Sequence, residues 1–380
     1  MKTLKLLAVA WLLILMVLGL CAGGVMAKDK AEESAPAKPR TEKEVIDAGF
    51  AYLVKKQSPD GSWESPYSIA ITAIAGLSFL ARDENPFDSA YTDTLLKAYG
   101  YMVKSIKDGK FPKQGHTWIH GQGFGTLFLS EFYGRFLLSS KKPDGIDAKA
   151  LKSEIEKAVR EIERNQSLSG GWWYEPNSPN QHEGSTTVCA VQAMRSAANY
   201  GIDINQATLD KGFEYLKKCQ NNDGGFDYQL DNSPNTTSMQ AGSAGALSTL
   251  VLMNKLDYPV LMNGLDFMEK TGLAGVSNSG FPYYGHFYAM MAMSLIDAEY
   301  GKSKPLAASW LATAPKELMK WQDQEGAWES KGWMASNGDK NVKYYSTSLS
   351  LLVLLTPKGY LSIFHRDQPV LPKPEKDTLK

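Results

Sequence analysis

Histidine, tyrosine and glutamate side chains at the starts of apolar segments are the groups of this sequence that could carry out acid–base chemistry. Four of the five histidines stand at such starts, and the stretch YYGHFY at 283–288 places one of them among tyrosines. A histidine exchanges a proton near neutral pH. We therefore take Tyr284, His286 and the adjacent pair His182 and Glu183 as candidate catalytic groups.

The reactions open to these four groups depend on which of them face one another. Cleavage of a glycan needs two opposed carboxyl groups about 5–9.5 Å apart, or a tyrosine or histidine base with a partner that neutralises charge. Spacing along the sequence does not establish such a pairing. A hydrogen-bonded residue at the rim of a folded domain is the structural alternative for each histidine, and both interpretations remain open.

A repeated loop precedes most of these apolar segments. The frame Gln-x-x-x-Gly-x-aromatic starts at Gln57, Gln166, Gln220 and Gln322. The glutamine can supply hydrogen bonds at the end of a helix, the glycine permits a turn with positive φ, and the aromatic side chain covers apolar area. These Gln-Gly-aromatic loops therefore indicate structural connections rather than chemistry.

Each loop joins two segments of different character. The segments before the loops have apolar residues at helical spacing with charges between them, whereas the segments after the loops are apolar nearly all round. Two weaker loops, Gly109-Lys110-Phe111 and Ser279-Gly280-Phe281, complete a series of six, and the loop glycines are 46 to 61 residues apart. The apolar segments are 69–81, 121–132, 186–198, 239–253, 286–296 and 346–355.

Six helical hairpins, none of which can bury its apolar helix alone, predict an all-α fold. The expected architecture is a closed (α/α)6 toroid with an inner and an outer layer of helices. An open array would need polar caps on its end helices, and the sequence does not provide them. Pro315 interrupts the last amphipathic segment, so we expect that outer helix to restart there.

The Gln-Gly-aromatic loops between paired helices resemble the repeats of squalene–hopene cyclases, oxidosqualene cyclases and protein prenyltransferase β-subunits. More narrowly, the stretches 283–293 and 344–366 resemble the secreted bacterial proteins described as prenyltransferase and squalene oxidase repeat proteins. The resemblance covers residues 41–365. It implies a terpenoid cyclase/prenyltransferase toroid with a central cavity that opens where the inner helices begin.

The catalytic motifs of those families have no full counterpart in this chain. The Asp-rich motif of proton-initiated cyclases corresponds to SPNTTSM at 233–239, which contains no carboxylate. Of the three zinc ligands of protein prenyltransferases, only the histidine has a counterpart, His286, because Asn235 and Thr237 stand where the resemblance implies an Asp-x-Cys pair. We therefore expect no metal site and no cofactor.

The first turns of the inner helices would form the ligand site if these helices begin at one rim. Helix N-termini favour an anion, but acidic side chains crowd the adjacent loops, so a cationic diphosphate pocket is not indicated. Serine and threonine also cap helices, and aromatic residues also fill a ring interior. The predicted ligand-binding residues are Trp118, His120, Gln122, His182, Thr187, Gln240, Tyr284, His286, Tyr288, Tyr344 and Tyr345.

Three functions fit this pattern. We favour a toroid that binds a small-molecule or lipid-like ligand, apolar or isoprenoid-like, in its central cavity without the catalytic groups of the related enzymes. The first alternative is an isoprenoid cyclase or transferase with different catalytic residues. The second is a glycan-active (α/α)6 hydrolase or lyase that uses the four acid–base candidates.

The ends of the chain predict export. Residues 1–27 read as a signal peptide, 28–40 as a disordered linker, 41–365 as the toroid and 366–380 as a tail. We expect a periplasmic or extracellular protein with no membrane span after cleavage. The 41 basic and 41 acidic residues balance, so nucleic acid is not an expected partner. We also expect a monomer.

Overall fold

The computed structural model describes residues 40–230, 238–253, 259–300, 304–336 and 342–365. Apart from Arg40 these residues belong to the compact unit Thr41–Lys380, and the fold below is that of this unit. The predicted signal peptide and C-terminal tail lie outside the described residues, as does the predicted linker except for Arg40. These three assignments therefore remain predictions.

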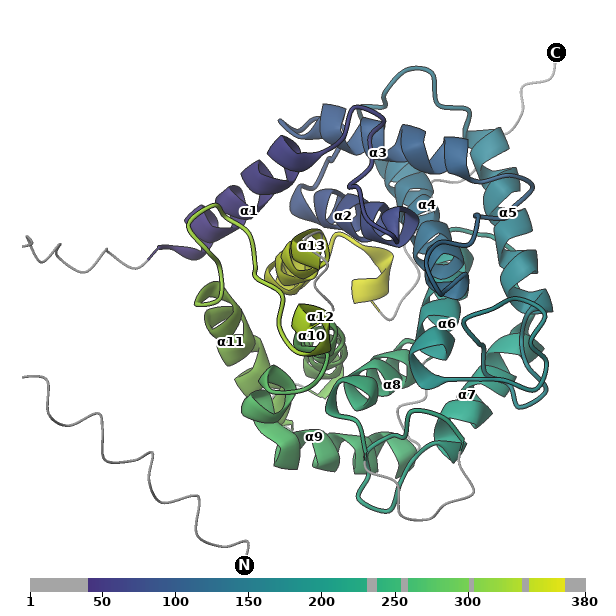
Figure 1. Cartoon of the computed structure of the whole chain (residues 1–380), viewed down its shortest axis with the longest axis vertical. Coiled ribbons are helices and arrows are strands. Elements are labelled where there is room, and N and C mark those ends of the chain that lie inside the picture. Colours follow the sequence, from purple (N-terminus) through teal and green to yellow (C-terminus); the bar gives the residue numbers. More distant parts are fainter. Residues whose placement is uncertain (1–39, 231–237, 254–258, 301–303, 337–341, 366–380) are drawn as a thin grey trace, which may run out of the picture. The chain divides into compact units, whose positions relative to one another are not determined.

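The helices of the described residues pair into six hairpins. Figure 1 shows that these hairpins form a ring with two layers. The outer helices are α1 (Glu42–Lys56), α3 (Thr92–Ser105), α5 (Ala148–Arg164), α7 (Gln206–Lys218), α9 (Pro259–Ser277) and α11 (Pro305–Met319). The inner helices are α2 (Ser68–Arg82), α4 (Ile119–Leu138), α6 (Gly184–Asn199), α8 (Gln240–Leu252), α10 (Pro282–Tyr300) and α13 (Val342–Leu355). The short elements are α12 (Trp333–Ser336), η2 (Thr356–Lys358) and η3 (Ser362–Phe364). The predicted (α/α)6 toroid is confirmed.

The two layers differ in the way that the hydrophobic pattern predicts. In the outer helix α5, Leu151, Ile155 and Ile162 are buried on one face, and lysine, arginine and glutamate residues occupy the rest of the surface. In the inner helix α2, every residue from Ser68 to Ala81 is buried. A helix with one apolar stripe covers a core, whereas a helix that is apolar all round lies inside it.

The ring is closed between the last and the first hairpin. The inner helix α13 packs against both α2 and α1. At the same junction the Nε2 group of Gln322 donates a hydrogen bond of 2.8 Å to the carbonyl of Val45, in the first turn of α1. These contacts exclude the open array.

The glutamine of each Gln-Gly-aromatic loop joins its own hairpin to the next outer helix. Gln166 Nε2 donates to the carbonyl of Gly170 at 2.8 Å and to that of Thr208, in the first turn of α7, also at 2.8 Å. The other three glutamines repeat this pair of bonds on the carbonyls of Gly61 and Thr94, Gly224 and Val260, and Gly326 and Val45. One side chain thus satisfies a loop carbonyl and a helix carbonyl in neighbouring repeats.

The aromatic residue of each loop ties its outer helix to its inner helix. Trp172 is fully buried, its indole Nε1 donates to the carbonyl of Ile162 at 2.8 Å, and its backbone N–H donates to Thr187 Oγ1 at 3.1 Å. Trp63 and Trp328 repeat both bonds. The loops therefore carry the structural role expected from the sequence.

The second hairpin lacks the loop glutamine, and Gln122 of α4 replaces it. Its Nε2 donates to the carbonyls of Gly109 at 2.7 Å and Ala158 at 3.3 Å, and its Oε1 accepts the backbone N–H of Phe111 at 3.0 Å. Gln122 follows its loop in the sequence, yet it makes the hydrogen bonds that the glutamine at the start of each Gln-Gly-aromatic loop makes.

One local expectation about α11 is wrong. The helix does not restart at Pro315 but runs through it from Pro305 to Met319. A proline inside a helix removes one backbone hydrogen bond. Pro315 is itself buried, so packing of its ring against the core offsets this loss.

The C-terminal segment closes the ring at the end where the inner helices terminate. The buried carboxylate of Glu131 accepts hydrogen bonds from the Ser362 backbone N–H at 2.9 Å and the Ser362 hydroxyl at 2.5 Å. It also accepts from Ser196 Oγ at 2.8 Å and from the Tyr200 hydroxyl at 3.0 Å. The elements η2 and η3 pack against inner helices, including α6 and α10. The C-terminal segment thus covers one end of the inner helices.

Candidate functional site

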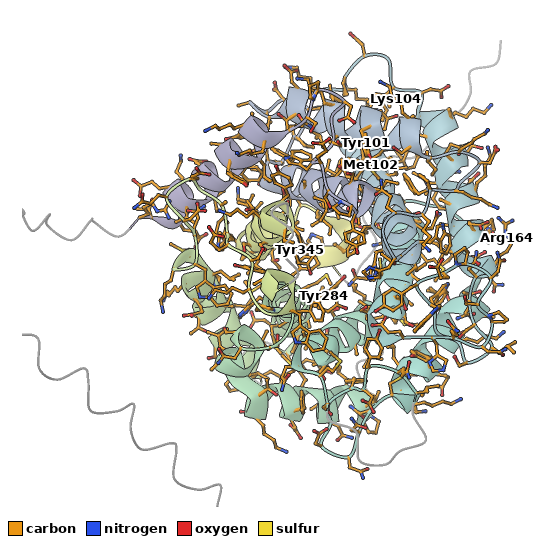
Figure 2. The ribbon with its side chains drawn as sticks, viewed as in Figure 1. Tyr101, Met102, Lys104, Arg164, Tyr284 and Tyr345 are labelled. Atoms are coloured by element: carbon orange, nitrogen blue, oxygen red, sulfur yellow. The ribbon has the colours of Figure 1, made fainter. Side chains whose placement is uncertain are left out.

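Three tyrosines from two neighbouring inner helices form an interior cluster. Tyr284 and Tyr288 stand one turn apart on α10 with their ring centroids 4.4 Å apart, and Tyr345 lies on α13. Figure 2 shows Tyr284 and Tyr345 close to the centre of the ring. Part of each of these two side chains is nevertheless accessible to solvent. The tyrosine cluster is therefore not fully enclosed by the side chains around it.

Two hydroxyl groups of this cluster have no hydrogen-bond partner among the described residues. They belong to Tyr284 and Tyr288, and both oxygen atoms are buried. A buried polar group left without a partner costs about 1–3 kcal/mol, so such groups in a folded protein call for an explanation. Burial raises the pKa of both phenols well above the usual value, so each remains protonated and able to donate.

A glycine makes room for one of these hydroxyls. A Cβ atom added at Gly245 of α8 would lie 2.6 Å from the Tyr284 hydroxyl oxygen. Any larger residue at this position would collide with the phenol. The contact fixes Tyr284 against α8 on the inner side of the ring.

His120 and Phe124 of α4 add aromatic surface to the same end of the ring. Their rings stack with centroids 6.4 Å apart, and His120 Nδ1 lies 2.9 Å from Thr117 Oγ1. Burial, with a smaller contribution from His116, lowers the pKa of His120 to about 4. The imidazole is therefore neutral at pH 7.

A second aromatic group lies in the segments that precede the inner helices. The Tyr174 and Tyr228 hydroxyls lie 2.7 Å apart, and the ring of Tyr174 contacts those of His116 and His120. The Tyr67 hydroxyl in turn lies 2.5 Å from His116 Nδ1. We did not predict Tyr174 or Tyr228 as site residues. A signal was present, because each stands two residues after the aromatic position of a Gln-Gly-aromatic loop.

Glu183 places a buried carboxyl group at the start of α6. It caps α6, where its carboxylate accepts from the Thr186 backbone N–H at 2.7 Å and from the Ser185 hydroxyl at 2.7 and 2.9 Å. Burial raises its pKa, although these hydrogen bonds act in the opposite direction. Its charge contributes to the raised pKa values of Tyr174 and Tyr284. Among the described residues, the other buried carboxyl groups are Glu131, at the closed end, and Glu161, on the outer helix α5.

The structure does not bring the two histidine candidates into this site. His286 faces the outer layer, where Nε2 lies 3.0 Å from Ser277 Oγ and the ring contacts Trp310 and Trp321. The sequence predicts His286 and Tyr284 in one ligand site, but residues two apart on a helix point in nearly opposite directions, so the two side chains face different layers. His182 likewise faces the outer helix α7, with Nδ1 3.1 Å from the Tyr215 hydroxyl.

The remaining predicted ligand-binding residues serve several purposes. Gln122 and Thr187 are buried and make the loop hydrogen bonds described above. Trp118 is buried before α4, with its backbone N–H donating to the Tyr174 carbonyl at 2.7 Å. Tyr344 faces the outer layer, 6.2 Å from the ring of Tyr52, and Gln240 is the half-buried first residue of α8. Of the predicted residues, Tyr284, Tyr288 and Tyr345 form the interior tyrosine cluster, whereas His120 lies against Phe124 and Tyr174.

Neither a metal centre nor a membrane-spanning helix is found in the described ranges. Within residues 40–365, leaving out the four undescribed gaps, no three His, Cys, Asp or Glu side chains gather in a way that could hold a metal ion. Over the same residues, every helix falls short of the length and hydropathy that a membrane crossing requires.

Comparison by sequence gives one short match. No family model matches the chain. A terpene cyclase–glycosyl transferase fusion protein of Humicola fuscoatra is 26% identical over 178 residues, which cover 38% of this chain and 12% of that protein. This chain therefore matches only a small part of the length of that relative.

Comparison by structure finds toroids of two kinds. A variant of the type II terpene cyclase MstE of Scytonema, solved with geranylgeranyl dihydroxybenzoate, has a TM-score of 0.55 and 12% identity over 84% of this chain and 98% of that chain. The α-1,6-mannanase GH76A of Salegentibacter sp. HEL1_6, solved with α-1,6-mannotetrose, has a TM-score of 0.61 and 12% identity over 83% and 98%. At such identities the likeness concerns the fold alone. It confirms the α/α-toroid that the resemblance implied.

Proposed function

We propose that this protein binds a small, uncharged and largely apolar molecule inside its ring, reached from the end where the inner helices begin. One observation carries the proposal: the interior tyrosine cluster is lined with aromatic surface and holds two buried hydroxyl groups that no described protein group satisfies. Ligand pockets are typically apolar and contain a few polar groups of this kind. An isoprenoid-like molecule fits such a lining.

The charges around the cluster support an uncharged ligand. His120 is neutral at pH 7, and the titratable neighbours that act on Tyr284 and Tyr288 include Tyr345, Cys189 and, for Tyr284, Glu183. None of these named neighbours is a cation. A diphosphate buried here would lack a compensating charge from them, which is costly.

The two kinds of structural neighbour differ in how well their chemistry suits this interior. MstE was solved with a geranylgeranyl compound and the mannanase with a mannotetrose. Glycan hydrolysis needs a second carboxyl group opposite the first. At the entrance of this ring, Glu183 is the buried carboxyl group among the described residues. The prenyl-like ligand is therefore the better proposal.

Glu183 also supports a second candidate, an isoprenoid cyclase with an unfamiliar acid. A carboxyl group whose pKa is raised by burial keeps its proton to a higher pH, as a general acid requires. Incubation with squalene, followed by mass spectrometry of the extract, tests this candidate. A cyclised product that disappears in Glu183→Gln would establish catalysis, and unchanged squalene would leave binding as the function.

Binding itself can be tested with geranylgeraniol as the probe. We expect one molecule per chain by native mass spectrometry, and slower hydrogen exchange of backbone amides near Tyr284, Tyr288 and Tyr345 when it is bound. Failure to bind at about 100 µM, which corresponds to about −5.5 kcal/mol, would contradict the proposal. So would protection confined to the outer helices.

A further inference from the structure

We infer that Tyr284 and Tyr288 act as a pair of donors to one uncharged oxygen atom of the ligand. The ring would then select neutral amphiphiles that end in a carbonyl or hydroxyl group and are otherwise apolar. This inference rests on the proposed function and adds the chemical class of the ligand to it.

The geometry of α10 supports a shared target for the two hydroxyls. The residues are four apart, so their side chains project from the same face of the helix. Their rings meet edge to face, with centroids 4.4 Å apart and planes inclined at 61°. Both hydroxyl oxygens are buried without a partner among the described residues, and the Tyr288 side chain is only 1% exposed. Two donors without a partner, carried by adjoining rings on one face of the helix, suit a single acceptor with two lone pairs.

The chemistry of the pair favours a neutral oxygen over an anionic one. Both phenols stay protonated, because burial is the largest contribution to their raised pKa values. The side chains that contribute next, Tyr345, Cys189 and Glu183, offer no positive charge. A neutral oxygen gains two hydrogen bonds here, whereas a hydrocarbon gains none and a diphosphate loses its hydration.

Four probes separate these cases: geranylgeraniol, a prenylated quinone, squalene and geranylgeranyl diphosphate. We expect geranylgeraniol and the quinone to bind about tenfold more tightly than squalene and the diphosphate. Two neutral hydrogen bonds at about 0.5–1.5 kcal/mol each give a factor of this size. The two oxygenated probes also distinguish a hydroxyl from a carbonyl end group.

Substitutions identify the groups that are responsible. The double variant Tyr284→Phe/Tyr288→Phe should lose about tenfold in affinity for geranylgeraniol and keep its affinity for squalene. Tyr101→Phe is the matched control, because Tyr101 lies on the outer helix α3, away from the ring centre (Figure 2). Near-ultraviolet circular dichroism of each variant checks that the fold is intact.

A glycine substitution tests the same hydroxyl with both tyrosines still present. Gly245→Ala puts a methyl group 2.6 Å from the Tyr284 hydroxyl and should weaken geranylgeraniol binding. Gly121→Ala on α4 is the control, because the nearest atom to its new methyl group is 3.6 Å away.

The outcomes separate the two proposals. Equal affinity for squalene and geranylgeraniol, or a double variant that still discriminates between them, would overturn the donor pair and leave the apolar site standing. If none of the four probes binds, the proposed function fails and the donor pair fails with it.

Discussion

At the scale of single residues, His286 shows how a side chain next to the site can belong to another layer. Its neighbour two positions earlier, Tyr284, faces the ring interior, whereas His286 is fully buried against Ser277, Trp310 and Trp321. Burial lowers the pKa of His286 to about 4. The imidazole is therefore neutral in the folded protein at pH 7, and its role is packing.

This burial predicts a dependence of stability on pH. An unfolded histidine has a pKa of about 6.5, so between pH 6.5 and about 4 the unfolded chain binds a proton that folded His286 does not. Stability contributed by this residue falls as pH falls through that window, by up to about 3 kcal/mol. When urea unfolding is measured at pH 7 and at pH 4.5, the free energy of unfolding should fall less for His286→Gln than for the unchanged chain. Equal losses would mean that His286 is protonated in the folded state.

At the scale of helices and loops, each Gln-Gly-aromatic loop joins the two helices of its hairpin and also docks on the next outer helix. Two features of the loop require a glycine: a positive φ and close approach to the backbone of the next repeat. Gly326 has φ of +90°, and a Cβ atom added there would lie 2.3 Å from the carbonyl oxygen of Ala48 in α1. Gly61, Gly170 and Gly224 also have a positive φ, and a Cβ atom added at each would likewise collide with a carbonyl oxygen of the next outer helix. The short contact lets each loop dock directly on the following repeat.

The double requirement predicts a large difference between two glycine substitutions. Gly326→Ala should lower the free energy of unfolding by more than about 2 kcal/mol, because it adds a collision with backbone to the strained φ. Gly145→Ala, with φ of +77° and no atom within 4 Å of the new methyl group, should cost about 1 kcal/mol. Thermal and urea unfolding of both variants would test this. Equal effects would show that strain alone, without docking, explains the glycine.

Much of this architecture could be predicted, because the repeats share the same loop residues and the same hydrophobic pattern. The loop frame and the change from amphipathic to apolar helices gave the two layers and the closed ring. The site was harder to predict. A helix such as α10, apolar on all sides, offers no polar face from which to tell that Tyr284 points inward and His286 outward. The bonds of Gln122 also reach across two hairpins, so no local pattern reveals them.

At the scale of the whole molecule, the two ends of the ring are built differently. The end where the inner helices begin carries aromatic side chains, among them Tyr174 and Tyr228. The other end is closed by the C-terminal segment, which Glu131 holds through two bonds to Ser362, while Asn199 Nδ2 donates to Ser362 Oγ at 3.0 Å. Arg135 adds a bond of 3.2 Å to the Tyr360 carbonyl. One buried carboxylate thus ties α4 and α6 to the last described residues of the chain.

Glu131 should therefore control whether this end stays closed. In Glu131→Gln an amide N–H₂ group would replace one acceptor oxygen and meet hydroxyl and N–H donors, so we expect a loss of about 2–4 kcal/mol in the free energy of unfolding. Hydrogen exchange at the backbone amides of Phe364 and His365 should rise more than exchange in the inner helices. Ser362→Ala is the milder comparison, because it removes the hydroxyl and keeps the backbone N–H bond to Glu131. If Glu131→Gln instead loosens all helices equally, the carboxylate supports the core as a whole and the segment is held by its buried Ile363 and Phe364 side chains.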